Sequence, residues 1–334
     1  MSYQPQFSVT PHLIKIIEEI SALREQITTA TIQVPWLPAL QKDAWVRNTH
    51  SSTAIEGNPL SLEEVKLLAE AKELPLATKR SRQEILNYFA GLRFIEKSLH
   101  KKTITKEDLL HLHAVMAKGV MDQGTHGLYR TLQVRVGNYF PPPPETVPTL
   151  MVEFLDWWNK ESARWSPVIS SAILHYRFEE IHPFADGNGR VGRALALWDL
   201  YRRGFDTHHI FSVDEVYWEN RPRYYQALQL IQHSQGELSS WLEFVAEAIH
   251  LTLERVWLRV KTYSEKNLEQ KVMLTPKQER LLYLLRERGA MAPREIWQTL
   301  KLSKQGALNL INPLVKAGLV VREGTRKSGK YRLE

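Results

Sequence analysis

Apolar side chains spaced three and four positions apart, which place one face of a helix against a core, recur along the chain up to residue 260. This spacing predicts helices in segments 11–20, 45–56, 61 onward, 81–97, 105–116, 149–158, 167–180, 191–201, 220–231 and 241–260. One segment differs, because Leu132, Val134 and Val136 alternate with polar residues, as in a half-buried strand. We therefore expect a mainly α core that carries one small β-hairpin at about 128–147.

The pattern changes at Thr275, where the predicted elements become shorter. Caps, glycines and apolar spacing predict three helices and then two strands, in segments 275–289, 292–300, 303–318, 319–323 and 330–333. This order resembles a winged helix-turn-helix domain. On that resemblance, the side chains that would face DNA lie on the third helix and on the wing: Ser303, Lys304, Gln305, Asn309, Arg326, Lys327 and Lys330.

Charge divides the chain in the same way. The polar stretch 261–274 reads as a linker between a first domain, 1–260, and a C-terminal domain, 275–334. The C-terminal domain holds 13 Lys and Arg against 5 Asp and Glu, so its net charge is +8 and that of the remainder is −1. Such asymmetry favours a polyanion, DNA among others, as the partner of this end. A folded appendage for protein contact is the alternative, and a homodimer stays open.

Composition excludes several classes of protein. The chain has no cysteine, so a disulfide framework and a thiolate metal site are both excluded. Residues 1–10 show neither the basic nor the apolar region of a signal peptide. No apolar run approaches the length that a membrane-spanning helix needs. We therefore expect a cytoplasmic protein without membrane contact.

The largest group of candidate functional residues close together in the sequence lies in segment 182–193, HPFADGNGRVGR. Glycines flank Asn188 and lead into an apolar helical pattern, so the free N–H groups of a helix N-terminus form an anion site. Arg190 and Arg193 share one face of the first turn, where cations are unfavourable unless an anion is bound. Asp186 offers a hard oxygen ligand that suits Mg²⁺, and His182 is a base that titrates near neutrality.

This run resembles the signature of the Fic family, HPFxDGNGRxxR, and matches it at every defined position. The resemblance implies a Fic helical core and the transfer of AMP from Mg·ATP to a Tyr, Thr or Ser hydroxyl of a target protein. It further implies His182 as the base, Asp186 as the Mg²⁺ ligand and Arg193 as the γ-phosphate ligand. The other phosphate contacts would come from Gly187, Asn188, Gly189 and Arg190, with Phe184 as a buried anchor.

Three further features resemble the same family. Ser52 and Glu56, four positions apart, lie in a helix at about 45–57 that resembles the family's inhibitory motif, (S/T)xxxE(G/N). The resemblance implies that Glu56 pairs with Arg193 and so misplaces ATP. The hairpin at 128–147 resembles the flap that docks the target segment. Tyr225 and Gln232 are the candidates for contact with adenine.

Other functions stay open at this point. A Fic core can transfer another group, such as UMP, phosphoryl or phosphocholine, or remove AMP. The alternative from a different class is a DNA-binding regulator whose Fic core only senses ATP.

Overall fold

The computed structural model describes residues 3–31, 36–74, 77–205, 208–233, 236–269, 275–316, 319–324 and 329–333. The chain divides into two compact units, Met1–Val260 and Lys261–Glu334. Each unit is described by itself below. No helix within these described ranges has the length and apolar content needed to cross a membrane.

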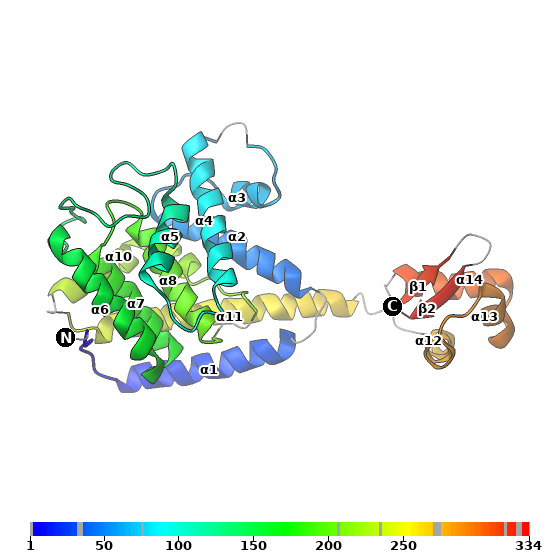
Figure 1. Cartoon of the computed structure of the whole chain (residues 1–334). Coiled ribbons are helices and arrows are strands. Elements are labelled where there is room, and N and C mark those ends of the chain that lie inside the picture. The colour runs from blue at the N-terminus through cyan, green and yellow to red at the C-terminus, as the bar shows by residue number, and fades with distance from the viewer. Residues whose placement is uncertain are drawn as a thin grey trace. The chain divides into compact units, whose positions relative to one another are not determined.

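The first unit is helical, as the apolar spacing predicted (Figure 1). Its helices are α1 (Pro11–Thr31), α2 (Leu37–Ile55), α3 (Leu62–Ala69), α4 (Lys79–Lys97), α5 (Lys106–Ala117), α6 (Val147–Lys160), α7 (Pro167–Ile181), α8 (Asn188–Arg202), α9 (Asp214–Glu219), α10 (Arg221–His233) and α11 (Ser239–Glu269). Short 3-10 turns lie at Pro144–Thr146 and Ser162–Arg164. Helix α11 runs on through much of the stretch 261–274 that the sequence suggested as a linker.

Local side-chain chemistry sets several helix starts. The Ser61 hydroxyl accepts the Glu64 N–H, and the Glu64 carboxylate accepts the Ser61 N–H, which forms the capping box that the sequence predicted. Thr105 and Asp108 form a second capping box at the start of α5. These bonds satisfy N–H groups that have no partner within the helix, and therefore fix where each helix begins.

Helices α7 and α8 pack side by side in the middle of the first unit (Figure 1). Both are buried around most of their circumference instead of along one stripe, which is typical of central helices. A buried carboxylate joins them, because Asp199 accepts hydrogen bonds from Trp158 Nε1 at 2.8 Å and from Ser170 Oγ at 2.5 Å. Burial raises the pKa of Asp199. The loop between α7 and α8 therefore begins and ends on two buried helices.

The hairpin at 128–147 is present in a reduced form. Val136 and Tyr139 form one antiparallel bridge, with both N–H···O distances at 2.9 Å. The strand expected over Leu132–Val136 is otherwise absent from the described residues. The physical reason is the run Pro141–Pro144, which has no N–H groups with which to extend a ladder.

The second unit contains α12 (Pro276–Arg288), α13 (Pro293–Thr299), α14 (Lys304–Lys316), β1 (Val320–Glu323) and β2 (Lys330–Leu333). The two strands are antiparallel, with Val320 opposite Leu333. The core of this unit is formed by Leu281, Leu284, Leu285, Met291, Ile296, Ile311, Leu314, Val320 and Tyr331. Arg326 and Lys327, which the sequence placed on a wing, lie outside the described residues.

Candidate active site

His182 lies at the C-terminal end of α7 in a left-handed conformation, with φ 50° and ψ 60°. Its N–H donates to the Phe178 carbonyl at 2.9 Å, which closes the last turn of the helix. A residue other than glycine rarely adopts this conformation, and such strain persists where the surroundings enforce it. Pro183 then prevents the helix from continuing. The imidazole is therefore presented from a fixed point at the end of a central helix.

The loop after His182 is closed by Asn188. The Asn188 side chain accepts the Phe184 N–H and donates to the Phe184 carbonyl, both at 2.9 Å. The Phe184 ring is fully buried and stacks on His113, with ring centroids 3.6 Å apart. The sequence grouped Asn188 with the glycines as a phosphate contact. In the structure, its side chain is used to hold the loop, which leaves its backbone N–H for that contact.

His113 is a supporting residue that the sequence did not single out. Its Nδ1 accepts the Gly127 N–H at 2.8 Å, so the proton of the neutral ring is on Nε2. That Nε2–H donates to the Asp186 carbonyl at 3.0 Å. Burial lowers the pKa of His113 to about 4, which keeps the ring neutral at pH 7. Because the partner residue is 73 positions away, no local pattern predicts this bond.

Arg130 is a second supporting residue that the sequence missed. This buried arginine donates from Nε to the His182 carbonyl at 2.8 Å and from Nη2 to the Pro142 carbonyl at 2.5 Å. Its backbone N–H donates to the Pro183 carbonyl at 2.9 Å. One side chain therefore links the start of the signature loop to both ends of the hairpin.

The N-terminus of α8 follows Gly187, whose φ of 81° suits glycine and whose position has no side-chain cap. Arg190 is 6% exposed, and its Nε and Nη1 have no hydrogen-bond partner among the described residues. Its Nη2 lies 3.9 Å from Asp186 Oδ1. A buried guanidinium with unmet donors beside free helix N–H groups favours a bound anion.

Arg193 is held by the last turns of α2. Its Nε donates to Ser52 Oγ at 2.9 Å, and its Nη2 donates to the Ser52 carbonyl and to Glu56 Oε1, both at 2.8 Å. Asp214 lies 3.6 Å from Nε. Burial alone would lower the pKa of Arg193, but Glu56 and the neighbouring oxygens raise it well above its ordinary value. The arginine is therefore charged. Its hydrogen bonds go to Ser52 in α2 and to Glu56 at the C-terminal cap of α2, and Asp214 of α9 is a second acidic neighbour.

The absence of a side chain at Gly189 leaves room for the contact between Glu56 and Arg193. A Cβ at Gly189 would lie 2.3 Å from Glu56 Oε1. The cleft around the contact measures about 290 Å³ and is lined by residues of the signature loop together with Glu56, Glu179, Tyr224, Tyr225 and Gln229. Glu56 occupies the end of this cleft at which Arg193 lies.

Of the two residues predicted to contact adenine, the structure describes the side chain of only one. Tyr225 lines the cleft, and its hydroxyl donates to the Ile55 carbonyl at 3.4 Å. The side chain of Gln232 lies outside what the structure describes. Gln229, one turn earlier on α10, is an amide that does line the cleft.

Glu179 is the third residue that sequence reasoning missed, since it resembles any acid near a helix end. Its Oε2 lies 3.7 Å from His182 Nδ1, and its Oε1 is buried without a hydrogen-bond partner among the described residues. Burial raises the pKa of Glu179 to about 8, with Arg193 opposing and Glu56 adding to the shift. Burial also lowers the pKa of His182 to about 4. His182 is therefore neutral at pH 7 and able to accept a proton.

Asp186 is the candidate Mg²⁺ ligand. Its side chain is 30% exposed, and its Oδ2 accepts one hydrogen bond, from the Asp122 N–H at 3.2 Å. Within the described part of the chain, no group of three or more His, Cys, Asp or Glu could hold a metal by itself. One accessible carboxylate beside a phosphate cradle fits Mg²⁺, which commonly takes its other oxygens from phosphates and water.

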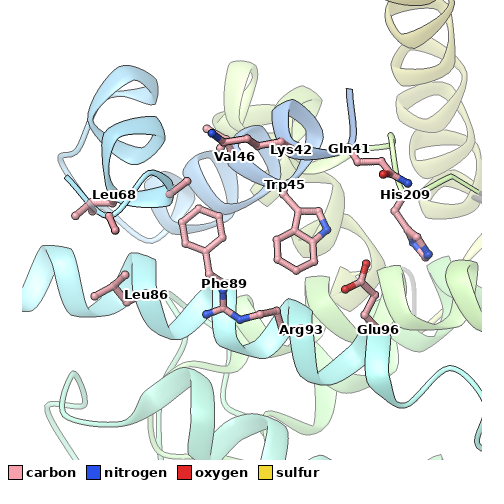
Figure 2. Close-up of a pocket in the computed structure, with 12 residues that line it drawn as sticks. Gln41, Lys42, Trp45, Val46, Leu68, Leu86, Phe89, Arg93, Glu96 and His209 are labelled. Carbon is pink, nitrogen blue, oxygen red and sulfur yellow. The ribbon is translucent and has the colours of Figure 1, made fainter. Parts of the chain in front are cut away.

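A separate cavity of about 520 Å³ lies between α2, α3 and α4 (Figure 2). Figure 2 shows the rings of Trp45 and Phe89 facing this space, with Gln41, Glu96 and His209 at one end. It shares no lining residue with the cleft around His182. We therefore do not assign it to the candidate active site.

Comparisons with known proteins agree with one another. Residues 103–200 match the model of the Fic/DOC family. The chain is 31% identical to "Protein adenylyltransferase Fic" of Culex quinquefasciatus over 74% of its own length and 49% of the relative. It is 30% identical to "Protein adenylyltransferase fic-1" of Caenorhabditis elegans over 75% of its own length and 48% of the relative. The chain thus spans about half the length of these curated relatives.

Solved structures give the same result. A Fic family protein from Desulfovibrio desulfuricans G20 superimposes with a TM-score of 0.70 at 27% identity, covering 99% of this chain and 98% of that one. Fic-1 from Caenorhabditis elegans superimposes with a TM-score of 0.66 at 26% identity, covering 75% of this chain and 73% of that one.

Proposed function

Because this chain belongs to the Fic/DOC family through residues 103–200, we propose that it is a protein adenylyltransferase, which moves AMP from ATP to a hydroxyl side chain of a target protein. The curated relatives that it matches carry the name protein adenylyltransferase. One structural observation carries the proposal. The neutral base His182, the guanidinium of Arg193 and the helix N-terminus after Gly187 line a single cleft. The partly unpaired Arg190 lies in the first turn of that helix.

The chemistry follows from these groups. Neutral His182 takes the proton of the target hydroxyl, and the hydroxyl oxygen forms a bond to the α-phosphorus of ATP. The bond from that phosphorus to the bridging oxygen of the β-phosphate breaks, and pyrophosphate leaves. Arg190 and the N–H groups of α8 stabilise the negative charge that develops on the phosphate oxygens. When bound at Asp186, Mg²⁺ would neutralise part of the phosphate charge.

The proposed enzyme is inhibited by its own α2. Glu56 accepts the hydrogen bond from Arg193 Nη2, the donor that would otherwise hold the γ-phosphate. A nucleotide that binds with this donor occupied holds its α-phosphate away from the line of attack. A displacement of about 1 Å is enough to slow such a reaction by about 100-fold. We infer that leaving Arg193 free for ATP is the step that activates the enzyme.

The target segment is proposed to dock on the hairpin at 128–147. Its exposed apolar side chains are Leu128, Leu132, Val136 and Phe140. Outside the Val136–Tyr139 bridge, an extended segment offers main-chain groups that another strand could pair with, independently of its sequence. This arrangement would bring a Tyr, Thr or Ser hydroxyl toward His182.

The direct test is transfer of label from α-labelled ATP with Mg²⁺ to protein. Wild type, Glu56→Gly and Glu56→Gly/His182→Ala are compared, and the mass of the adduct is measured. We expect an adduct of AMP mass in Glu56→Gly and a loss of about 100- to 10,000-fold in rate without the base. An adduct of another mass would indicate a different donor. Nucleotide binding without any label would reject the transferase and favour a nucleotide sensor.

A second proposal concerns residues 275–334, whose net charge of +8 favours nucleic acid as a partner. Lys304, Gln305 and Asn309 lie on α14, in the place that a recognition helix would have. The test is duplex DNA binding by the full chain at two salt concentrations. Affinity that falls steeply with salt supports the proposal, and no binding at low salt rejects it.

A further inference from the structure

A cleft in the second unit is unexplained by either proposal above. It measures about 540 Å³ and is lined by residues of α13, α14 and the sheet: Ala292, Pro293, Arg294, Trp297, Lys304, Ala307, Leu308, Ile311, Arg322, Gly329, Lys330 and Tyr331. We call it the C-terminal cleft. Its volume lies in the range of about 300–1,000 Å³ that is common for small-molecule sites.

The floor of the C-terminal cleft is apolar and partly aromatic. Ile311 and Tyr331 belong to the buried core of the unit, and they are 0% and 5% exposed. Trp297 and Leu308 line the cleft and are only partly buried, so each leaves apolar surface in contact with solvent. Burying this surface against a ligand would be favourable by the hydrophobic effect.

The rim of the cleft is positively charged. Arg294, Lys304, Arg322 and Lys330 are all lining residues, and none of the described lining residues is acidic. Lys304 and Lys330 form no ion pair with another described residue. Two acidic side chains of the unit do not line the cleft, because Glu323 pairs with Arg332 and Glu295 accepts the backbone N–H of Ala292 at the start of α13. The cleft therefore combines an apolar floor with two lysines, Lys304 and Lys330, that pair with no described acid.

Contact with DNA alone does not account for this combination. Phosphate contacts require exposed cations but no concave apolar floor. Of the residues expected to face DNA, Ser303, Gln305 and Asn309 do not line the cleft. Among the described residues, only Lys304 and Lys330 belong to both sets.

We propose that the C-terminal cleft binds a small amphipathic anion, with an aromatic or branched apolar body and one carboxylate, sulfonate or phosphate group. The body packs on Trp297 and Leu308, and the anionic group lies between Lys304 and Lys330. Because these two lysines would also face DNA, a bound anion and a DNA duplex compete for them. This inference does not depend on the adenylyltransferase proposal.

The test uses the full chain and 1-anilinonaphthalene-8-sulfonate, an aromatic sulfonate whose fluorescence rises in an apolar site. Lys304→Gln/Lys330→Gln removes two rim charges. Lys277→Gln/Arg286→Gln removes two exposed charges of α12, outside the cleft, and is the matched control. Ala292→Trp fills the cleft without changing charge. Circular dichroism establishes that each variant is folded.

We expect saturable binding that weakens roughly fivefold or more in Lys304→Gln/Lys330→Gln and by less than about twofold in the control. Ala292→Trp should reduce the fluorescence amplitude and the affinity together. Equal weakening in both double variants would mean that only net charge matters, and would overturn the proposal. Displacement of the probe by duplex DNA, combined with full binding in Ala292→Trp, would reject the cleft in favour of a nucleic-acid surface.

Discussion

Glu56 Oε1 lies 2.8 Å from Nη2 of Arg193, although 137 positions separate the two residues. The two partners differ in access to water, since the side chain of Arg193 is 0% exposed and that of Glu56 is 34% exposed. The carboxylate can therefore leave for solvent, whereas the guanidinium cannot. The loss of an acidic partner is costly for a buried cation, so a phosphate that replaces Glu56 restores the interaction that Arg193 loses.

The steric fit between Gly189 and Glu56 gives a first prediction. In Glu56→Gly, Gly189→Ala should cost less than about 1 kcal/mol, because the new Cβ then meets no closer atom than Arg193 Nη1, at 3.2 Å, and alanine is the better helix former. In the wild type, the new Cβ meets Glu56 Oε1, so the same change should be less favourable. Denaturant unfolding of the four proteins measures this coupling. Equal effects in both backgrounds would contradict the contact.

Arg130 gives a second prediction, which separates positioning from nucleotide binding. In a Glu56→Gly background, Arg130→Gln should slow AMP transfer by about 10- to 100-fold, because the loop at His182 and the hairpin lose their shared donor. ATP affinity should change little, since the hydrogen bonds of the Arg130 side chain reach neither Arg190 nor Arg193. Arg164→Gln, an exposed arginine paired with Glu161, is the control. A loss confined to ATP affinity would refute the role.

The buried histidines predict a pH dependence of stability. Burial lowers the pKa of His113 to about 4 and that of His175 to about 3, against 6.5 in an unfolded chain. Between these values the unfolded chain binds more protons, so stability contributed by these rings rises with pH and levels off above about 6.5. We expect the difference in unfolding free energy between wild type and His113→Gln to grow from pH 4 to 6.5. A constant difference would show that His113 titrates normally.

Glu179 predicts a pH dependence of stability with the opposite sign. Its pKa is raised to about 8 in the folded chain, against 4.5 without burial. Across this window the folded chain holds the extra proton, so the contribution of Glu179 to stability falls as pH rises from about 4.5 to 8. Glu179→Gln, which stays neutral, should therefore gain stability relative to wild type as pH increases. Unfolding at pH 5 and pH 8 measures this, and parallel curves would exclude a buried protonated carboxyl.

The sequence predicted those features that local pattern controls. Helical spacing located most helices of the first unit, although not α9. Ser61 and Glu64 marked a capping box, and the glycines of 182–193 placed a loop before α8. The Fic helical core and the mainly α fold are confirmed by the family match and by the solved structures. The resemblance also anticipated the pairing of Glu56 with Arg193, which is present.

The sequence did not predict the residues that hold the site together. His113 reaches Asp186 across 73 positions, and Arg130 reaches His182 across 52. A single histidine or arginine has no periodicity, so only the folded chain identifies its partner. The hairpin strand was overestimated for a related reason. Alternation in Leu132–Val136 is a local signal, but pairing depends on Pro141–Pro144, which cannot donate.

The location of Glu56 in the same chain as Arg193 has a kinetic consequence. An inhibitor that is covalently attached acts at a fixed effective concentration, which is set by the fold and not by the amount of protein. Dilution or overexpression would leave the fraction of blocked molecules unchanged. ATP would compete for Arg193 with the Glu56 carboxylate, whose effective concentration is constant. Activity would therefore depend on the ATP concentration and on any binding event that displaces α2. In the proposed mechanism, the inhibited state is thereby set within each single molecule.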